Sequence, residues 1–285
     1  MDFDYLKPKD LSGALEILAR GGKETRILAG GTDILVNIQE GLENPPTLVD
    51  INCLEELKGI EEKNGRIEIG SLVTHARIVD SPLLREKARP LTQACAEIGS
   101  PQIRSRGTIG GNLANASPSG DSIPALFVLG AVLTLRGPEG EREVPVEDFA
   151  TGVKETVLGP DELLLKISFP VPAASGRGFF KKLGQRKALA IAKVSLAAWL
   201  EVERGKITSP RLALGAVATT VIRATETESY LEGKTLDEDI ITSSARSIQK
   251  ESRAISDIRS SADYRNEMTG LLLARGLEEL AELKT

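Results

Sequence analysis

Two glycine-rich segments carry the residue types that bind large anions. They are 29–33, with the sequence AGGTD, and 108–112, with the sequence TIGGN. Glycine lets the main chain approach a bulky anion, and successive N–H groups at a turn or helix start supply fixed partial positive charge. The pattern therefore predicts a cradle for a pyrophosphate group. Hydroxyl and amide groups that could bond phosphate or ribose accompany it at Thr32, Thr108, Asn112 and Asn115.

Both common nucleotide-binding motifs are missing from the sequence. No G-x-G-x-x-G follows a predicted strand and no G-x-x-x-x-G-K-[ST] occurs, so a dinucleotide would have to be held in another way. The first glycine segment alone is explained more simply by a turn that leads into a helix cap, and the second segment is what favours binding. Arg104 and Arg106 precede that second segment, where they could either neutralise phosphate charge or brace the loop.

Apolar spacing and helix caps indicate which elements would position these segments. The first segment follows an extended run at 26–28 and precedes an apolar helix start at Ile34, so its glycines would sit where a strand turns into a helix. The stretch 99–124, rich in Gly, Ser, Asn and Pro, is typical of a functional loop. The other elements predicted in this part are helices at 11–20, 83–98 and 124–129 and strands at 47–51, 66–70, 132–135, 143–146 and 163–169.

A pair of prolines, Pro170 and Pro172, predicts a domain boundary. They close an apolar strand and precede a short run of small residues, so we expect one domain at 1–174 and another at 175–285. The second domain is predicted to be α+β, with an antiparallel sheet packed against amphipathic helices. Its strands are expected at 178–183, 194–203 and 207–217, and its helices at 237–252 and 262–282.

Composition excludes several classes of protein. The 285 residues are 41% hydrophobic, enough for more than one core, and the net charge of -5 gives no attraction for nucleic acid. Cys53 and Cys95 are too few for an iron–sulfur cluster or a cysteine-rich zinc site. The N-terminal residues are acidic and no apolar run is long enough to cross a bilayer, which predicts a cytoplasmic protein.

The two glycine segments, read with their flanks, resemble a known family. AGGTDILV at 29–36 together with IRSRGTIGGNLANASPSGD at 103–121 is similar to the FAD-binding medium subunit of the xanthine dehydrogenase and carbon monoxide dehydrogenase family, the molybdenum hydroxylases. The resemblance continues through 180–195 to SADYR at 261–265, nearly the whole chain. It implies an α+β fold in which two N-terminal α/β subdomains, about 1–55 and 56–174, clasp FAD. A C-terminal domain with a three-stranded antiparallel sheet and helices would follow.

The resemblance also implies which residues hold the cofactor. Residues 27–34 and the second glycine segment would enclose the pyrophosphate, Asp121 would accept a hydrogen bond from an FAD hydroxyl, and Ile98 and Lys182 would approach the flavin ring. We expect non-covalent FAD, because the single histidine, His75, lies outside both glycine motifs and is more simply structural. The implied cofactor-binding residues are Ile27, Leu28, Ala29, Gly30, Gly31, Thr32, Asp33, Ile34, Ile98, Thr108, Ile109, Gly110, Gly111, Asn112, Asn115, Asp121, Leu164 and Lys182.

The function implied is electron relay. FAD would receive electrons from the iron–sulfur clusters of a small partner subunit and pass them to NAD, a quinone or dioxygen, while substrate is oxidised at a molybdenum cofactor on a large partner subunit. We expect no metal site and no catalytic residue in this chain. Two alternatives stay open: a stand-alone flavin-dependent oxidoreductase, and a nucleotide-binding module without a redox role, which would be colourless.

Overall fold

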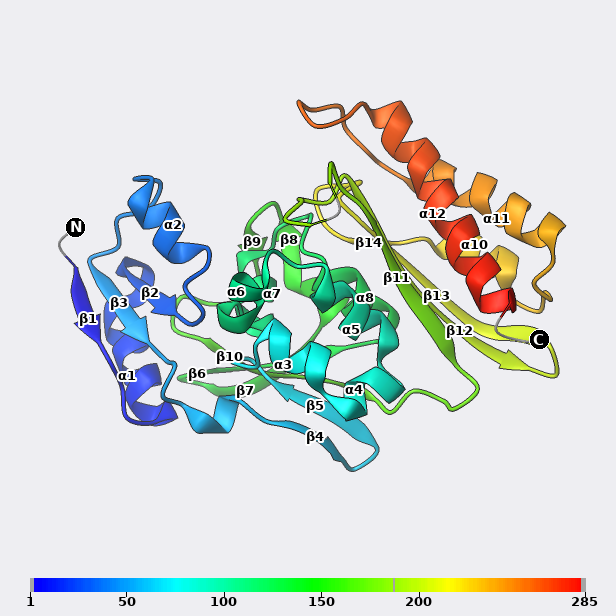
Figure 1. The fold of residues 1–285 in the computed structure, drawn as a ribbon. Helices are drawn as coiled ribbons and strands as arrows, with labels where there is room; N and C mark the ends of the chain where they lie inside the picture. The colour runs from blue at the N-terminus through cyan, green and yellow to red at the C-terminus, as the bar shows by residue number, and fades with distance from the viewer. Residues whose placement is uncertain (1–2, 187, 283–285) are drawn as a thin grey trace.

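The chain folds around three main β-sheets that follow one another in sequence (Figure 1). A computed structural model describes residues 3–186 and 188–282. The first sheet lies near the N-terminus, the second at the centre and the third under the C-terminal helices. No helix in these described ranges is long and apolar enough to span a membrane.

The N-terminal region is a small parallel sheet in the strand order β1-β3-β2. The helix that follows β1 starts at Asp10, whose side chain caps it by accepting a hydrogen bond from the N–H of Gly13, and it buries Ala14 and Leu18. The strand β2 leads through the first glycine segment into a short helix, as predicted. The elements are β1 (Asp4–Leu6), α1 (Leu11–Gly21), β2 (Thr25–Leu28), α2 (Ile34–Gln39) and β3 (Thr47–Asp50).

The central region is a five-stranded antiparallel sheet in the order β4-β5-β10-β6-β7, with short helices gathered on one side of it in Figure 1. Its core includes fully buried Phe149 and Phe169. The elements are β4 (Ile60–Lys63), β5 (Arg66–Gly70), α3 (His75–Asp80), α4 (Pro82–Lys87), α5 (Arg89–Ala96), α6 (Pro101–Arg106), α7 (Ile109–Asn115), α8 (Ser122–Val128), β6 (Val132–Gly137), β7 (Gly140–Pro145), α9 (Val146–Phe149), β8 (Ala150–Gly152), β9 (Glu155–Thr156) and β10 (Leu163–Pro170).

Two sequence predictions for this region need correction. The helix expected at 83–98 is two helices, α4 and α5, which meet at Ala88; Pro90 lies in the first turn of α5, where a proline is tolerated but cannot continue an earlier helix. The loop expected at 99–124 contains α6 and α7 and the start of α8. Ser100 and Thr108 cap α6 and α7, so the short polar stretches were helix starts.

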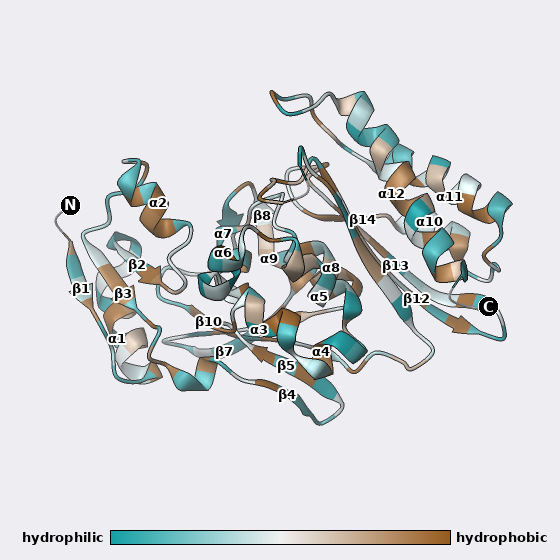
Figure 2. Cartoon of the chain, viewed as in Figure 1, coloured by the Kyte–Doolittle hydropathy of each residue, from teal (hydrophilic) through white to brown (hydrophobic). Residues whose placement is uncertain are grey.

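The C-terminal region has a four-stranded antiparallel sheet, and the expected three-stranded sheet is therefore incorrect. The additional strand, β14, is only two residues long and pairs with Ala213 and Leu214, which is too short to give an alternating pattern. The helices α10 to α12 alternate hydrophilic and hydrophobic segments along their length (Figure 2), as expected of helices with one face on a core. The elements are β11 (Arg177–Leu183), β12 (Val194–Glu203), β13 (Lys206–Gly215), β14 (Ile222–Arg223), α10 (Thr225–Leu231), α11 (Glu238–Glu251) and α12 (Ala262–Glu282).

The SADYR segment at 261–265, at the start of α12, anchors this helix. The guanidinium of Arg265 is buried, donates to the carbonyl oxygen of Ala216 at 2.9 Å and pairs with Asp257 at 2.6 Å. Trp199, on β12, is a core residue as predicted. The core thus accounts for both features without a ligand.

Candidate functional site

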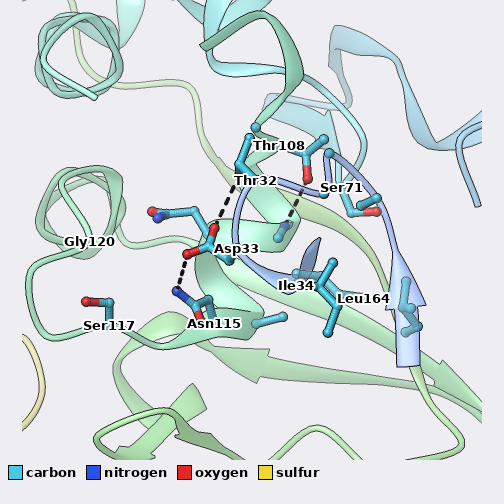
Figure 3. A pocket seen from close by; sticks show the side chains of 18 of the residues that line it. Thr32, Asp33, Ile34, Ser71, Thr108, Asn115, Ser117, Gly120 and Leu164 are labelled. Carbon is cyan, nitrogen blue, oxygen red and sulfur yellow. Dashed lines mark hydrogen bonds between the residues drawn. The ribbon is translucent and has the colours of Figure 1, made fainter. Parts of the chain in front are cut away.

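A cavity of about 850 Å³ opens between the N-terminal sheet and the central helices. Its volume falls in the range of small-molecule and cofactor sites, roughly 300–1,000 Å³. Both glycine segments line it, although they are far apart in sequence (Figure 3). The walls are completed by the start of β10, the segment 156–160 and the segment 189–191 that follows β11.

The first glycine segment supplies a run of free backbone donors. The N–H groups of residues 30–34 make no hydrogen bond with any part of the chain that the structure describes, although this loop starts a helix. Gly31 has φ +77°, a conformation in which L-residues are strained. Consecutive unpaired N–H groups at a strand-to-helix turn form a concave site for an anion.

The second glycine segment begins α7. Thr108 is the N-cap and its Oγ1 accepts a hydrogen bond from the N–H of Gly111 at 3.1 Å. A β-carbon at position 110 would lie within 2.7 Å of the backbone of Ser71, so this glycine is required for packing. A β-carbon at position 111 would meet only Thr108 Oγ1, at 2.9 Å, and would otherwise face open space. The two adjacent glycines therefore have different reasons to lack a side chain.

The two segments contact each other directly. A β-carbon at position 30 would lie 2.2 Å from the carbonyl oxygen of Arg106, so the loops touch through their backbones. Asn115 Nδ2 donates to Asp33 Oδ1 at 3.0 Å, and Thr32 Oγ1 donates to Asp33 Oδ2 at 3.3 Å (Figure 3). Asp33, which was predicted as a cofactor-binding residue, thus links the loops, and its side chain makes no capping bond to α2.

At another part of the wall, a buried ion pair joins Asp121 to Lys182. Lys182 Nζ donates to Asp121 Oδ2 at 2.5 Å and to the carbonyl oxygen of Glu97 at 3.0 Å. Burial raises the pKa of Asp121 to about 6, while the ammonium of Lys182 acts to lower it. Asp121 Oδ1 is buried without a hydrogen-bond partner in the described chain, and so is Ser71 Oγ. Buried polar atoms of this kind normally have partners, and both residues line the cavity.

His75 also lies in the cavity wall, which the sequence did not predict. It is only 2% exposed, and its ring packs beneath Gly107. Burial lowers the pKa of His75 to about 4, and the nearby Arg104 lowers it as well. Its Nδ1 lies 3.5 Å from the sulfur of Cys95, whose pKa burial raises. The imidazole is therefore neutral at pH 7 and supports the loop from behind.

The structure brings most of the predicted site residues together. All line the cavity except Leu28, Ile109 and Lys182. Ile109 is fully buried in the core, and Lys182 stands behind Asp121. Of the two arginines before the second segment, Arg104 braces the chain by donating to the carbonyl oxygens of Ile98 and Gly99, at 3.0 and 3.3 Å.

Several cavity residues were missed by sequence reasoning. Ser71 follows β5, and Lys154 lies in the turn between β8 and β9 with φ +60°. Neither belongs to a recognisable motif, because each reaches the cavity only through tertiary packing. Leu189 and Ile191 are more than half exposed and line the cavity too, so the run of apolar residues after β11 was the one available signal.

The cavity suits a ligand with a pyrophosphate group. It offers unpaired N–H groups at residues 30–34, an open side at Gly111 and unpartnered oxygens on Ser71 and Asp121. Those oxygens could accept hydrogen bonds from ribityl or ribose hydroxyls. No group of three or more His, Cys, Asp or Glu residues in the described ranges could hold a metal ion. The residues present therefore fit FAD.

Comparisons with known proteins agree with this geometry. Residues 1–172 match the family described as the FAD binding domain in molybdopterin dehydrogenase, and residues 179–280 match the CO dehydrogenase flavoprotein C-terminal domain. The carbon monoxide dehydrogenase medium chain of Afipia carboxidovorans is 35% identical over 97% of this chain and 96% of its own length. A putative xanthine dehydrogenase FAD-binding subunit of Escherichia coli K12 is 30% identical over 92% of this chain and 90% of its own.

Solved structures give the same result. Reconstituted CO dehydrogenase from Oligotropha carboxidovorans superposes with a TM-score of 0.95 at 33% identity, covering 99% of this chain and 98% of the other. Quinoline 2-oxidoreductase from Pseudomonas putida 86 gives a TM-score of 0.93 at 30% identity, with the same coverage. The resemblance read from the glycine segments is confirmed, and the chain belongs to the carbon monoxide dehydrogenase and xanthine dehydrogenase family of molybdenum hydroxylases as an FAD-binding oxidoreductase subunit.

Proposed function

We propose that this chain binds FAD without a covalent bond and relays electrons through it inside a larger complex. The observation that carries the proposal is the row of unpaired N–H groups at residues 30–34, which line the same cavity as Gly111. The two segments would hold the pyrophosphate, and the other residues predicted from sequence would complete the site. His75 is buried and neutral, which is consistent with non-covalent binding.

The residues around the ring end would set its electrostatics. Bound FAD supplies one- and two-electron transfer between an iron–sulfur donor and an acceptor such as NAD, a quinone or dioxygen. Lys182 is held by Asp121 and by the carbonyl oxygen of Glu97, so its ammonium is a fixed positive charge. The ammonium would favour negative charge that develops beside it, and the paired carboxylate of Asp121 offsets part of that effect. Ile98 would exclude water from the ring face.

Partner subunits follow from what this chain lacks. The sequence has two cysteines, and in the described ranges no cluster of ligands could hold a metal. We therefore propose that iron–sulfur clusters belong to a small subunit and the molybdenum cofactor to a large subunit. The names of the relatives support this, since two of them are medium chains of carbon monoxide dehydrogenase. The cytoplasmic location stays a prediction from sequence.

The domain division also forms part of the proposal. A boundary at 174/175 is supported by the two family matches, which stop at residue 172 and start at residue 179. The split near residue 55 is supported by the parallel first sheet and the antiparallel second sheet. One core cluster nevertheless joins Ala14 and Val49 to Leu163, so these two subdomains pack together.

An absorbance spectrum of the purified chain, with and without added FAD, tests the function. We expect a flavin spectrum, flavin release into the supernatant on acid precipitation, and co-purification of partner chains carrying iron–sulfur clusters. Flavin that stays with the precipitate would contradict non-covalent binding. A chain that stays colourless with FAD and with its partners would favour a nucleotide-binding module without a redox role.

A further inference from the structure

We propose that Asn52, held by Asp50, is a positioning residue that turns the first N–H groups of the loop at 29–33 toward the bound pyrophosphate. Asn52 follows β3 and belongs to neither glycine segment. The inference rests on the proposed function, since it assumes that this loop holds a pyrophosphate. Asn52 lies outside the cavity wall and acts on the wall through the backbone of the loop.

The contacts of Asn52 are with the backbone of the loop. Its Nδ2 donates to the carbonyl oxygen of Ala29 at 2.7 Å and is 3.4 Å from that of Leu28. The same nitrogen donates to Asp50 Oδ1 at 2.7 Å. The two amide hydrogens therefore have two strong acceptors, one on the loop and one on the strand beside it.

The orientation of the amide is determined by its surroundings. Both close neighbours, the carbonyl of Ala29 and the carboxylate of Asp50, can only accept hydrogen bonds, so the nitrogen must face them. Burial acts to raise the pKa of Asp50, but hydrogen bonds from Tyr5 and from Asn52 outweigh it, and the pKa lies below its usual value. Asp50 is thus ionised at pH 7 and holds Asn52 by charge-assisted bonds.

The effect on the loop follows from the planarity of the peptide bond. In a trans peptide the carbonyl of Ala29 and the N–H of Gly30 point in opposite directions. Because Asn52 holds that carbonyl on one side, the N–H of Gly30 is directed to the other, and Gly30 lines the cavity without an intrachain partner for this N–H in the described ranges. Without Asn52, the peptide plane could rotate and withdraw the donor.

A purely structural role would give a different result. Asn52 could serve only to stabilise the turn after β3, where its own N–H donates to Asp50 Oδ1 at 2.9 Å. Its replacement would then lower the melting temperature and leave the ligand affinity of the folded chain unchanged. Positioning predicts instead that the folded variant loses affinity for the ligand, because Asn52 bonds the loop through its side chain. Asp50 keeps its bonds to Tyr5 and to the main chain, so the turn itself should persist.

The test uses the full-length chain, with any chains that co-purify, freed of flavin and titrated with FAD and with ADP. ADP has the pyrophosphate but no flavin ring. We expect Asn52→Ala and Asn52→Asp to fold and to weaken both ligands about tenfold, the loss of one well-placed hydrogen bond to the loop, with at most a small fall in melting temperature. Asn52→Gln, which keeps the amide, should recover part of the affinity. Cys53→Ala is the matched control, because the thiol of Cys53, the next residue in the chain, donates to the carbonyl oxygen of Pro8 and not to the loop.

Affinity within twofold of wild type in folded Asn52→Ala and Asn52→Asp would overturn the positioning role. A fall in melting temperature with unchanged affinity would assign Asn52 to the turn alone and would also overturn it. A wild-type chain that binds neither FAD nor ADP would instead contradict the proposed function, and the inference with it. The two failures are therefore distinguishable.

Discussion

Adjacent glycines at 110 and 111 allow a test that separates folding from cofactor binding. Gly110 is buried against the backbone of Ser71, and an alanine there would force atoms to within 2.7 Å. Overpacking of this kind costs about 1–3 kcal/mol. At Gly111 the only neighbour is the hydroxyl of Thr108, and the residue lies inside a helix, where alanine is favoured over glycine by about 0.5–1 kcal/mol.

We therefore expect Gly110→Ala to lower stability and Gly111→Ala to leave it unchanged or slightly raised. For FAD affinity we expect the opposite order, with the larger loss in Gly111→Ala. A methyl group at position 111 would stand where the pyrophosphate must approach and would break at least one charge-assisted hydrogen bond, worth about 1.5–3 kcal/mol. The FAD dissociation constant should rise about 10- to 150-fold. Gly111→Val, which is bulkier, should abolish retention of the flavin.

The assay combines thermal unfolding of the flavin-free chain with FAD titration by fluorescence. Gly59→Ala is the matched control, because a β-carbon there meets nothing within 4 Å and the residue lies away from the cavity lining. A Gly111→Ala chain that binds FAD as tightly as wild type would refute the cradle. Equal loss of stability in both alanine variants would show that the two positions were wrongly distinguished.

Three further predictions concern other side chains. Burial lowers the pKa of His75 to about 4, so the free energy of unfolding of the wild type should fall by about 3 kcal/mol relative to that of His75→Gln as pH falls from 6.5 to 4. Urea unfolding across this pH range checks the prediction, and an equal dependence of the two unfolding free energies on pH would contradict it. Lys154→Met should weaken FAD about two- to fivefold at low salt and less at high salt, because Lys154 lines the cavity and forms no ion pair within the described ranges; a salt-independent loss would count against a charge effect. Arg265→Met should destabilise the chain by about 2 kcal/mol, since the carbonyl of Ala216 loses its donor, without changing FAD affinity; calorimetry and titration together decide this.

The sequence was sufficient for those parts of the site that depend on local backbone chemistry. Glycine pairs beside polar residues mark helix starts, and the structure has such starts after Asp33 and Thr108. Free N–H groups follow only the first of them, because the N–H groups of 109–112 donate to Val73, Ser71 and Thr108. Local patterns also gave β11, β12 and β13 within a few residues. Short elements were not predicted. The two residues of β14 carry no periodicity, and the break at Ala88 lies within a helical pattern that reads as one helix.

Residues that act through tertiary contacts could not be predicted from the sequence. Ser71 and Lys154 line the cavity, whereas Asn52 contacts the backbone of the first loop from outside it. The three residues come from separate turns, and only the folding of the chain brings them together. The pairing of Asp121 with Lys182 is of the same kind, since 61 positions separate them in the chain. Sequence motifs identify backbone that a ligand can approach. They do not identify side chains that orient that backbone from behind.

The contact between the two glycine segments makes them parts of one site. Gly30 lies against the carbonyl oxygen of Arg106, and Asp33 accepts a hydrogen bond from Asn115, so each loop fixes the other before a ligand arrives. A preorganised site loses less conformational entropy on binding than a flexible one. Neither glycine segment contains a Lys or Arg residue, so the segments themselves act through the N–H dipoles of residues 30–34, whose effect falls off steeply with distance and angle. Precise mutual placement of the loops is therefore a requirement of binding. It is met by the close backbone contact at Gly30 and by the hydrogen bond between Asn115 and Asp33.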